Sequence, residues 1–324
     1  MLRIRDLRVS IGKLELVHVE RLDIPAGRRV GLVGESGSGK SVTAMSIAGL
    51  QAREADLSGS IDFDGRELVG LSDAAMAKVR GAQIGFIPQD PTRALNPTTR
   101  VGKQVAEALR LNTNLGRNAV RNRVLELFEQ VRLPDPATLA TRYPHQISGG
   151  QQQRVLIAMA IATRPKLLIA DEPTTALDVT VQNEILRLIV ELSRSEGMAL
   201  LFVSHELGVV RAVCDDICVI YGGKLAEFAT ADAIAEQPRH RYTEALIAAN
   251  PGLPEGDEIA RQTGRRFDVI DGSVPSVGRF PAGCRFRNRC RHASAQCAHE
   301  PPATEIGGSH WVKCWHQVGT EGGP

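Results

Sequence analysis

Residues 34–41 of this chain read Gly-Glu-Ser-Gly-Ser-Gly-Lys-Ser and match the phosphate-loop pattern G-x-x-x-x-G-K-[ST] at every fixed position. Residues 29–33 before the loop predict a short strand, and residues 42–50 after it predict a helix, which is the setting that this pattern needs. Glycines let the backbone curl so that several N–H groups point at one phosphate, and the helix start adds the positive end of its dipole. The chain is therefore expected to fold as a nucleotide-binding α/β protein.

The side chains of this loop have separate expected roles. Lys40 can reach the β- and γ-phosphates of the nucleotide, and the Ser41 hydroxyl can bind Mg²⁺. The other positions are expected to surround the phosphates with backbone N–H groups. The predicted nucleotide-binding residues of the loop are Gly34, Ser36, Gly37, Ser38, Gly39, Lys40, Ser41 and Val42.

The composition is that of an ordinary globular protein. Of the 324 residues, 43% are hydrophobic and 23% are charged, and the formal net charge is +2. Dispersed basic residues and only 4% aromatic residues argue against a nucleic-acid partner. No stretch approaches the roughly 18 apolar residues of a membrane-spanning helix, and the first residues have no apolar signal-peptide core. We therefore expect a cytoplasmic chain with reduced thiols.

The order of the predicted elements indicates a sheet covered by helices on both faces. Residues 90–100 are predicted to form an exposed loop, and residues 101–131 have helical spacing of their apolar positions. We expect a nucleotide-binding domain at 1–235, with an inserted helical subdomain at about 90–163, and a C-terminal extension at 236–324. Strands are expected at 2–11, 14–22, 28–33, 58–63, 83–87, 166–170 and 198–203, and further helices at 151–163 and 179–195.

The apolar strand at 167–170 ends in two carboxylates, Asp171 and Glu172. Asp171 can hold Mg²⁺ through its waters, and Glu172 is then placed to polarise the attacking water as general base. A strand followed by a plain acidic turn is the alternative, but a preceding phosphate loop makes the catalytic interpretation more specific. Gln89 follows the strand at 83–87, where its amide can meet the metal or the attacking water.

A second glycine-rich turn opens the helix at 151–163. Free N–H groups at such a helix start attract anions. Because one nucleotide already has its phosphate loop, a second phosphate-binding turn suggests that ATP lies between two chains; a simple glycine-rich N-cap is the alternative. The residues of the turn are Ser148, Gly149, Gly150 and Gln151.

Together these motifs resemble the ATP-binding subunits of ABC transporters. The resemblance implies a P-loop ABC ATPase core, with a mixed β-sheet flanked by helices, an inserted helical subdomain and a small Cys-rich C-terminal extension. The motifs that follow the family's order and spacing are the phosphate loop, Gln89, the Ser148 turn, Asp171, Glu172, Asp178 and His205.

The resemblance also implies roles for single residues. Gln89 resembles the loop glutamine that senses the metal and the membrane partner. Asp178 resembles the aspartate of the loop that crosses the dimer interface, and His205 the switch histidine that contacts the γ-phosphate. Ile11 stands where the family usually has an aromatic residue against adenine, so apolar contact would remain without ring stacking.

The C-terminal part is similar to the ATPase subunits of oligopeptide, dipeptide and nickel importers, on residues 240–246, 272–276, 283–290 and 310–315. This implies an ATP-hydrolysing subunit that powers peptide import; nickel or another small solute, or a soluble ABC ATPase, are the alternatives. The implied partners are two transmembrane permease subunits, a second and paralogous ATPase subunit, and indirectly an extracellular substrate-binding protein. The chain would then lie peripherally on the cytoplasmic face of the cell membrane.

Four cysteines of the extension are candidate metal ligands. In a cytoplasmic chain, four thiols in one short segment usually bind metal, but neither the paired C-x₂-C spacing of zinc sites nor ferredoxin-type spacing is present. Spacing leaves zinc and an iron–sulfur cluster both open. In the importer subunits that this chain resembles, four cysteines carry a [4Fe–4S] cluster, which favours the cluster. The four are Cys284, Cys290, Cys297 and Cys314, whereas Cys214 and Cys218 are interpreted as core residues.

Overall fold

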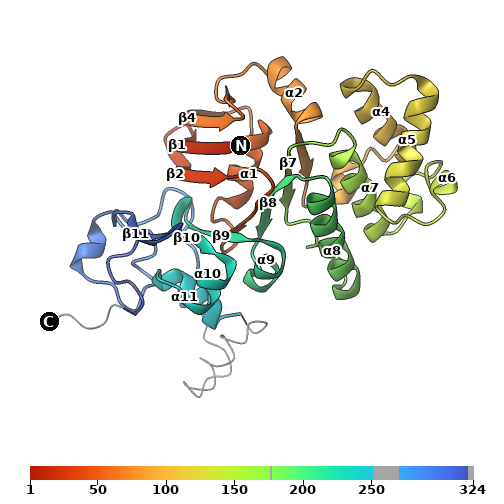
Figure 1. The fold of residues 1–324 in the computed structure, drawn as a ribbon. Helices are drawn as coiled ribbons and strands as arrows, with labels where there is room; N and C mark the ends of the chain where they lie inside the picture. Colours follow the sequence, from red (N-terminus) through yellow and green to blue (C-terminus); the bar gives the residue numbers. More distant parts are fainter. Residues whose placement is uncertain (176, 251–269, 320–324) are drawn as a thin grey trace. The chain divides into compact units, whose positions relative to one another are not determined.

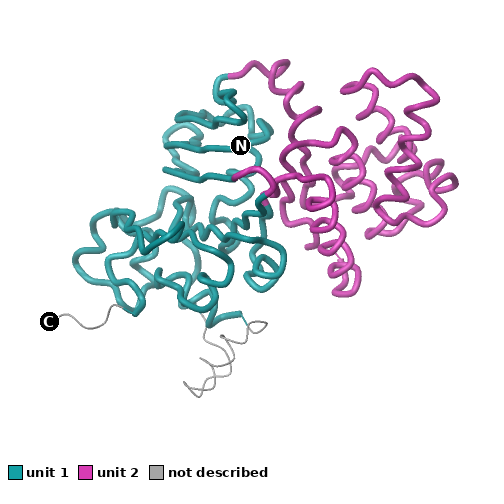
Figure 2. The backbone as a smooth tube through the Cα atoms, viewed as in Figure 1, with its two compact units in different colours: residues 1–24, 28–70, 202–324 teal, residues 25–27, 71–201 magenta. Residues whose placement is uncertain are grey.

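The structure is a computed structural model that describes residues 1–175, 177–250 and 270–319. Contacts within the chain divide it into two compact units, which Figure 2 colours separately. Unit 1 comprises residues 1–24, 28–70 and 202–324, and unit 2 comprises residues 25–27 and 71–201. The phosphate loop belongs to unit 1, and the carboxylates Asp171 and Glu172 belong to unit 2.

Unit 1 begins with antiparallel strands that follow from alternating apolar residues. In β1 (Leu2–Ile11) the side chains of Leu2, Ile4, Leu7 and Val9 are buried, and the residues between Leu2 and Ile4 and between Leu7 and Val9 are exposed. β1 pairs antiparallel with β2 (Leu14–Ile24) and with β4 (Ala55–Phe63). The strands expected at 2–11, 14–22 and 58–63 are thereby confirmed.

The centre of unit 1 is built on a buried strand that sequence patterns did not predict. β9 (Asp216–Tyr221) is buried along its whole length, pairs parallel with β3 (Arg29–Val33), and pairs antiparallel with β10 (Lys224–Thr230). Within unit 1 the strand order is β5-β4-β1-β2-β10-β9-β3. The remaining elements of this part are α1 (Lys40–Ala48), β5 (Arg66–Glu67), α9 (Leu207–Val213) and α10 (Ala231–Glu236).

The C-terminal extension continues the sheet of unit 1. β12 (His310–Val312) pairs antiparallel with β10, with Val312 opposite Glu227, and β11 (Thr304–Gly307) pairs with β12. Figure 1 shows this hairpin, in blue, beside β10 and close to α11 (Arg241–Ala248). A 3₁₀ helix at Ala295–Ala298 completes the described elements of the extension. Residues 251–269 and 320–324 of the expected extension lie outside the described residues.

Unit 2 holds a parallel strand pair and the predicted run of helices. β6 (Ile84–Ile87) pairs parallel with β7 (Leu167–Asp171), and α4, α5 and α7 pack together (Figure 1). The helical pattern at 101–131 forms two helices, because Thr113 ends α4 and Gly116 caps the start of α5. The helices of the unit are α2 (Asp73–Ala82), α3 (Pro91–Ala94), α4 (Val101–Asn112), α5 (Arg117–Gln130), α6 (Pro136–Leu139), α7 (Gly149–Ile161), α8 (Val179–Ser195) and a 3₁₀ turn at Pro144–Gln146.

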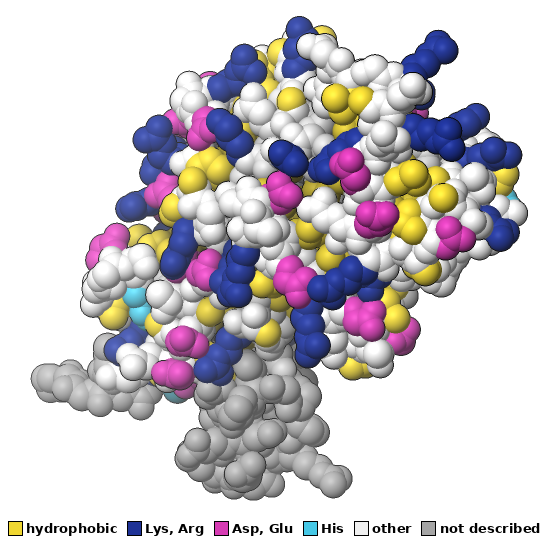
Figure 3. All heavy atoms as spheres, turned by 45° about the vertical axis from the view of Figure 1, so that its right-hand side comes forward, with side chains coloured by type: hydrophobic (Ala, Val, Ile, Leu, Met, Phe, Trp, Pro, Cys, Tyr) yellow, Lys and Arg dark blue, Asp and Glu magenta, His cyan; other side chains and the backbone are white. Residues whose placement is uncertain are grey.

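Two further features concern the boundary between the units and the surface. The boundary falls within β8 (Ala199–Ser204), whose residues are all buried. On the face shown in Figure 3, basic and acidic side chains are interspersed rather than segregated by sign. Within the part of the chain that the structure describes, no helix is long and apolar enough to cross a membrane.

Candidate nucleotide-binding and catalytic site

The phosphate loop joins β3 to α1 in a backbone conformation that only glycine adopts easily. Gly37 and Gly39 have φ angles of 77° and 98°, in the left-handed region that side chains disfavour. A β-carbon at Gly39 would lie 2.8 Å from a methyl group of Val17, and one at Gly34 would collide with the carbonyl oxygen of Ile220. Local conformation and close packing therefore explain all three glycine positions of this loop.

The loop is shaped to receive an anion. The N-cap residue of α1 is Gly39, so the loop leads directly into a helix start, where the positive end of the helix dipole favours anions. Ser36 and Gly37 are exposed at the tip, and the Lys40 ammonium donates to the carbonyl oxygens of Gly34 at 2.8 Å and Glu35 at 3.0 Å. Ser41 and Val42 lie in the first turn of α1, as expected for a phosphate loop.

In unit 2 the structure brings together two of the predicted catalytic residues. The Gln89 amide donates to the Glu172 carboxylate at 3.0 Å, and the Thr175 hydroxyl donates to the same oxygen at 3.1 Å. Glu172 has a φ angle of 45°, a strained conformation for a residue with a side chain. Asp171 is the last residue of β7 and is buried. Gln89 and Glu172 are thus placed to act on one water molecule.

The turn at Ser148 is a capped helix start. The Ser148 hydroxyl accepts from the Gln151 N–H at 3.3 Å, and the Gln151 side chain accepts from the Ser148 N–H at 3.0 Å. The capping box agrees with the alternative considered from the sequence, which is a simple glycine-rich N-cap. It still leaves the hydroxyl proton of Ser148 for an outside acceptor, because the serine oxygen only accepts in the capping box. Ser148 and Gly149 are exposed.

Asp178 lies close to this turn. A β-carbon on Gly150 would lie 2.7 Å from a methyl group of Val181, so α7 and the start of α8 are in close contact. Asp178 caps α8 by accepting from the Val181 N–H at 3.0 Å, and its side chain is exposed. The two motifs predicted to meet a second chain therefore share one exposed region of unit 2.

Ile11 and His205 belong to unit 1, like the phosphate loop. Ile11 ends β1 and leaves 40% of its surface exposed, as an apolar contact for a base would require. His205 follows β8 and is exposed. Of the predicted Mg²⁺ ligands, Ser41 belongs to unit 1, and Gln89 and Asp171 belong to unit 2.

The pKa of three extension cysteines, Cys284, Cys290 and Cys314, is raised by burial and by neighbouring thiols. Burial is the main reason that the pKa of Cys284 rises to about 11; the other three thiols add to the rise, and a backbone N–H of Phe286 opposes it. Cys284 also donates its backbone N–H to the carbonyl oxygen of Cys297 at 3.1 Å. Among the described residues, however, no three Cys, His, Asp or Glu side chains are arranged as a ready ligand set for a metal ion.

Three contact residues of this site were not found from sequence patterns. Glu35 of the phosphate loop pairs with Arg289 and Tyr242 of the C-terminal part, more than 200 positions away in the chain. Local motifs do not indicate such pairs. The resemblance had marked the segments 240–246 and 283–290 as characteristic, without giving a partner for them.

The comparisons with known proteins agree with this geometry. The sequence matches the ABC transporter family over residues 17–175 and the C-terminal region of oligopeptide/dipeptide transporters over residues 226–297. It is 41% identical over 317 residues to a putative peptide import ATP-binding protein of Brucella abortus (strain 2308), covering 98% of this chain and 93% of that protein. It is 40% identical over 323 residues to the oligopeptide transport ATP-binding protein OppD of Escherichia coli (strain K12), covering 98% and 94%.

Solved structures support the same assignment. The dimeric post-hydrolysis structure of the ATP-binding cassette MJ0796 with ADP and Pi shares 28% identity with a TM-score of 0.64, covering 71% of this chain and 99% of that one. The structure of cbiO1 from Clostridium perfringens, part of the ABC transporter complex cbiONQ, shares 27% identity with a TM-score of 0.64, covering 73% and 91%. The chain therefore belongs to the family of ABC-transporter ATP-binding proteins that includes the oligopeptide and dipeptide transport ATP-binding proteins.

Proposed function

We propose that this ABC ATPase hydrolyses ATP to power the import of peptides through a membrane channel formed by other subunits. The observation that carries the proposal is the hydrolytic residue set, with Lys40 in the phosphate loop and the Gln89–Glu172 pair beside the buried Asp171. The cargo is inferred from relatives of nearly full length that are named for oligopeptide and dipeptide transport.

The chain's own residues would divide the reaction between them. The loop amides and Lys40 bind the phosphates, and Lys40 exchanges its two carbonyl acceptors for phosphate oxygens. Glu172 takes the proton of the attacking water, and Gln89 orients that carboxylate or the water. His205 would contact the γ-phosphate. Mg²⁺, when held by Ser41, Asp171 and Gln89, supplies positive charge to the phosphate oxygens.

The proposed assembly has two ATPase subunits. The exposed Ser148 turn and Asp178 would face the phosphate loop of a second, paralogous ATPase subunit, in keeping with the dimeric structure of the similar cassette MJ0796. Two transmembrane permease subunits would form the channel, and an extracellular substrate-binding protein would deliver the cargo. In this arrangement the chain is a peripheral protein at the cytoplasmic face of the membrane.

The test is transport by the assembled complex. The test uses proteoliposomes that contain the permeases, both ATPase subunits and the binding protein. They should accumulate a labelled di- or oligopeptide only when ATP is present on the side of the membrane where the ATPase subunits lie. A complex with Glu172→Gln should bind ATP and fail to transport. Uptake of nickel without uptake of peptide would show that the cargo is nickel. ATP hydrolysis by a chain that binds no permease would contradict the assignment as a transporter subunit.

We further propose that Cys284, Cys290, Cys297 and Cys314 bind a [4Fe–4S] cluster, with zinc as the alternative. The pKa values of Cys284, Cys290 and Cys314 are raised chiefly by burial and further by the neighbouring thiols, and a bound cation, which binds the deprotonated form, would offset both effects. The side chains would have to turn toward one another, because the described residues hold no finished ligand set. Anaerobically purified protein should be brown with about four irons per chain. Colourless protein with one zinc per chain would rule out the cluster.

A further inference from the structure

Two arginines of the cysteine-bearing segment link the extension to the phosphate loop, Arg289 directly and Arg285 through the neighbouring turn at residues 222–223. Arg285 directly follows Cys284, and Arg289 directly precedes Cys290. Their side chains are largely buried, with 13% and 6% exposed. Both belong to unit 1, as the phosphate loop does.

Arg289 forms a bidentate ion pair with Glu35, the second residue of the phosphate loop. Its Nη1 lies 2.6 Å from Oε2 of Glu35, and its Nη2 lies 3.1 Å from Oε1. The guanidinium is fixed by the extension's backbone, since its Nε donates to the carbonyl oxygen of Asp271 at 2.7 Å and Nη2 to that of Gly272 at 3.2 Å. A bidentate pair of this kind is both strong and directional.

Tyr242 of α11 holds the backbone of the same residue. The Glu35 N–H donates to the Tyr242 hydroxyl at 2.9 Å. The Tyr242 ring is fully buried and packs edge-on against Tyr221 at 4.7 Å and in a tilted arrangement against Phe286 at 5.2 Å. Glu35 is therefore held through its main chain and its side chain by two rigid neighbours.

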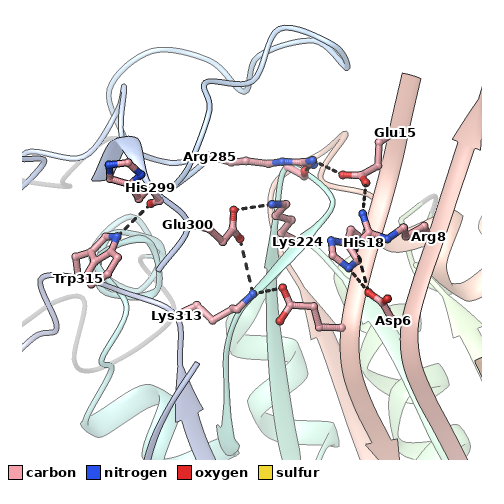
Figure 4. Close-up of polar contacts among 12 residues, drawn as sticks. Asp6, Arg8, Glu15, His18, Lys224, Arg285, His299, Glu300, Lys313 and Trp315 are labelled. Carbon is pink, nitrogen blue, oxygen red and sulfur yellow. Dashed lines mark hydrogen bonds and ion pairs between the residues drawn. The ribbon is translucent and has the colours of Figure 1, made fainter. Parts of the chain in front are cut away.

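Arg285 approaches the loop from another side. It donates to the carbonyl oxygen of Gly222 and pairs with Glu15 at 2.6 Å, and Figure 4 shows its side chain extending from the extension to that carboxylate. The neighbouring Gly223 N–H donates to the carbonyl oxygen of Ser38 in the phosphate loop at 2.7 Å. The extension thus contacts the loop directly at residue 35 and through one turn at residue 38.

The position of Glu35 matters for nucleotide binding for two reasons. Its carbonyl oxygen accepts from Lys40, so a displaced Glu35 also displaces the ammonium that binds the phosphates. Its carboxylate is only 27% exposed and belongs to a loop that must bind a strongly negative ligand. Without a neutralising partner, that charge would repel the phosphates.

We propose that Arg289 and Tyr242 are positioning residues for the phosphate loop, and that the cysteine-bearing extension sets ATP affinity by neutralising and orienting Glu35. The proposal depends on ATP binding alone and not on the cargo. Because coupling between two sites is reciprocal, ATP must in turn stabilise the extension. The two consequences can be measured separately on the purified full-length chain.

The first experiment measures the dissociation constant of the ATP analogue AMP-PNP with Mg²⁺. Arg289→Gln should weaken binding by about tenfold, the loss expected for one strong charged contact. The double variant Glu35→Gln, Arg289→Gln should return to within about threefold of the parent, because the unpaired carboxylate is gone. Arg279→Ala, an exposed arginine of the same extension, is the control that should leave binding unchanged.

Two results would overturn the proposal. One is binding by Arg289→Gln within about twofold of the parent, and the other is a double variant as weak as the single one. If Arg289→Gln fails to fold, Tyr242→Phe tests the same loop contact while retaining the ring, and it should weaken binding by about threefold. Unchanged binding by Tyr242→Phe would then refute the positioning role.

The second experiment measures amide hydrogen exchange of residues 286–290 with and without AMP-PNP and Mg²⁺. Exchange in the parent should slow when the nucleotide binds, and this protection should be lost in Glu35→Gln. Equal exchange rates with and without nucleotide in the parent would show that the extension is not coupled to the loop.

Discussion

Glu227 is the carboxylate whose loss should most clearly detach the extension from the sheet. It lies on β10 beside an irregularity in the pairing with β9, and its side chain is completely buried. One oxygen accepts from the Arg239 N–H at 2.7 Å and from His310 at 2.8 Å; the other accepts from the His240 N–H at 2.9 Å. Glu227 thus connects the N-terminus of α11 to the β11–β12 hairpin.

The expected cost of Glu227→Gln follows from these three bonds. The amide retains one oxygen, so two of the bonds survive without charge assistance, at a loss of about 1 kcal/mol each. The amide nitrogen would face the His240 N–H, and an unsatisfied buried donor costs about 2 kcal/mol. We therefore expect the extension to lose about 4 kcal/mol of its free energy of unfolding.

The chain offers a selective probe for this experiment. Both of its tryptophans, Trp311 and Trp315, lie in the extension, and Trp311 stacks on Phe228 of β10. Urea unfolding followed by tryptophan fluorescence therefore reports on the extension. With a slope of about 2 kcal/mol per molar urea, the midpoint should fall by about 2 M. Glu305→Gln, at an exposed ion pair with Arg21, is the matched control and should shift the midpoint by less than about 0.3 M. A Glu227→Gln midpoint equal to that of the control would refute the argument.

Three further predictions concern catalysis, the loop at 90–99 and pH. Glu172→Gln should retain AMP-PNP binding and lose most ATP turnover in the assembled complex, because the base is lost while Lys40 remains; turnover at the parental rate would remove Glu172 from that role. Leu95 was expected to be exposed in this loop but is buried, so Leu95→Ala should lower the free energy of unfolding by about 2–5 kcal/mol, as thermal melting can show, whereas the exposed Asn96→Ala should affect coupling to transport instead. An unchanged melting temperature for Leu95→Ala would contradict its place in the core. Burial lowers the pKa of His240 to about 4, so the unfolded chain binds the extra proton first, and the extension should lose stability as the pH falls from about 6.5 toward 4. The urea midpoint followed by tryptophan fluorescence should fall with pH over this range in the parent. It should not do so in His240→Asn, which retains an acceptor for the N-terminus of α11. The same dependence on pH in both proteins would show that other groups cause it.

Local sequence patterns were sufficient to predict the structure of the phosphate loop and the place of the two carboxylates at the end of β7. The phosphate loop needs left-handed glycines and a following helix, and both requirements are visible over a few residues. The carboxylates at the end of β7 are equally local, because an apolar run of strand length is followed at once by two acidic residues. Chemistry that resides in one short segment can be predicted from that segment.

Patterns failed where an apolar run admits more than one structure. The spacing of Cys214 and Cys218 would place them one turn apart in a helix, but Cys214 is the C-cap of α9 and Cys218 lies in β9. The interpretation of both as core residues is confirmed, because both are buried. Burial follows from apolar character, whereas the choice between helix and strand in residues 216–221 depends on the neighbouring strands β3 and β10.

The position of β12 shows why the extension and the nucleotide-binding part are parts of one folded unit. β10 pairs with β9 along one edge, whereas its other edge meets β2 only at Lys224 and β12 at Glu227 and Phe228. Without the extension, that edge would expose unpaired backbone groups, the buried Glu227 would lose His310, and Glu35 in the phosphate loop would lose Arg289. Each of these losses leaves a polar group whose partner lies beyond residue 280. A phosphate loop that carries a carboxylate at position 35 is thus adapted to a chain in which the extension is present, and nucleotide affinity and the stability of the extension are properties of the same contacts.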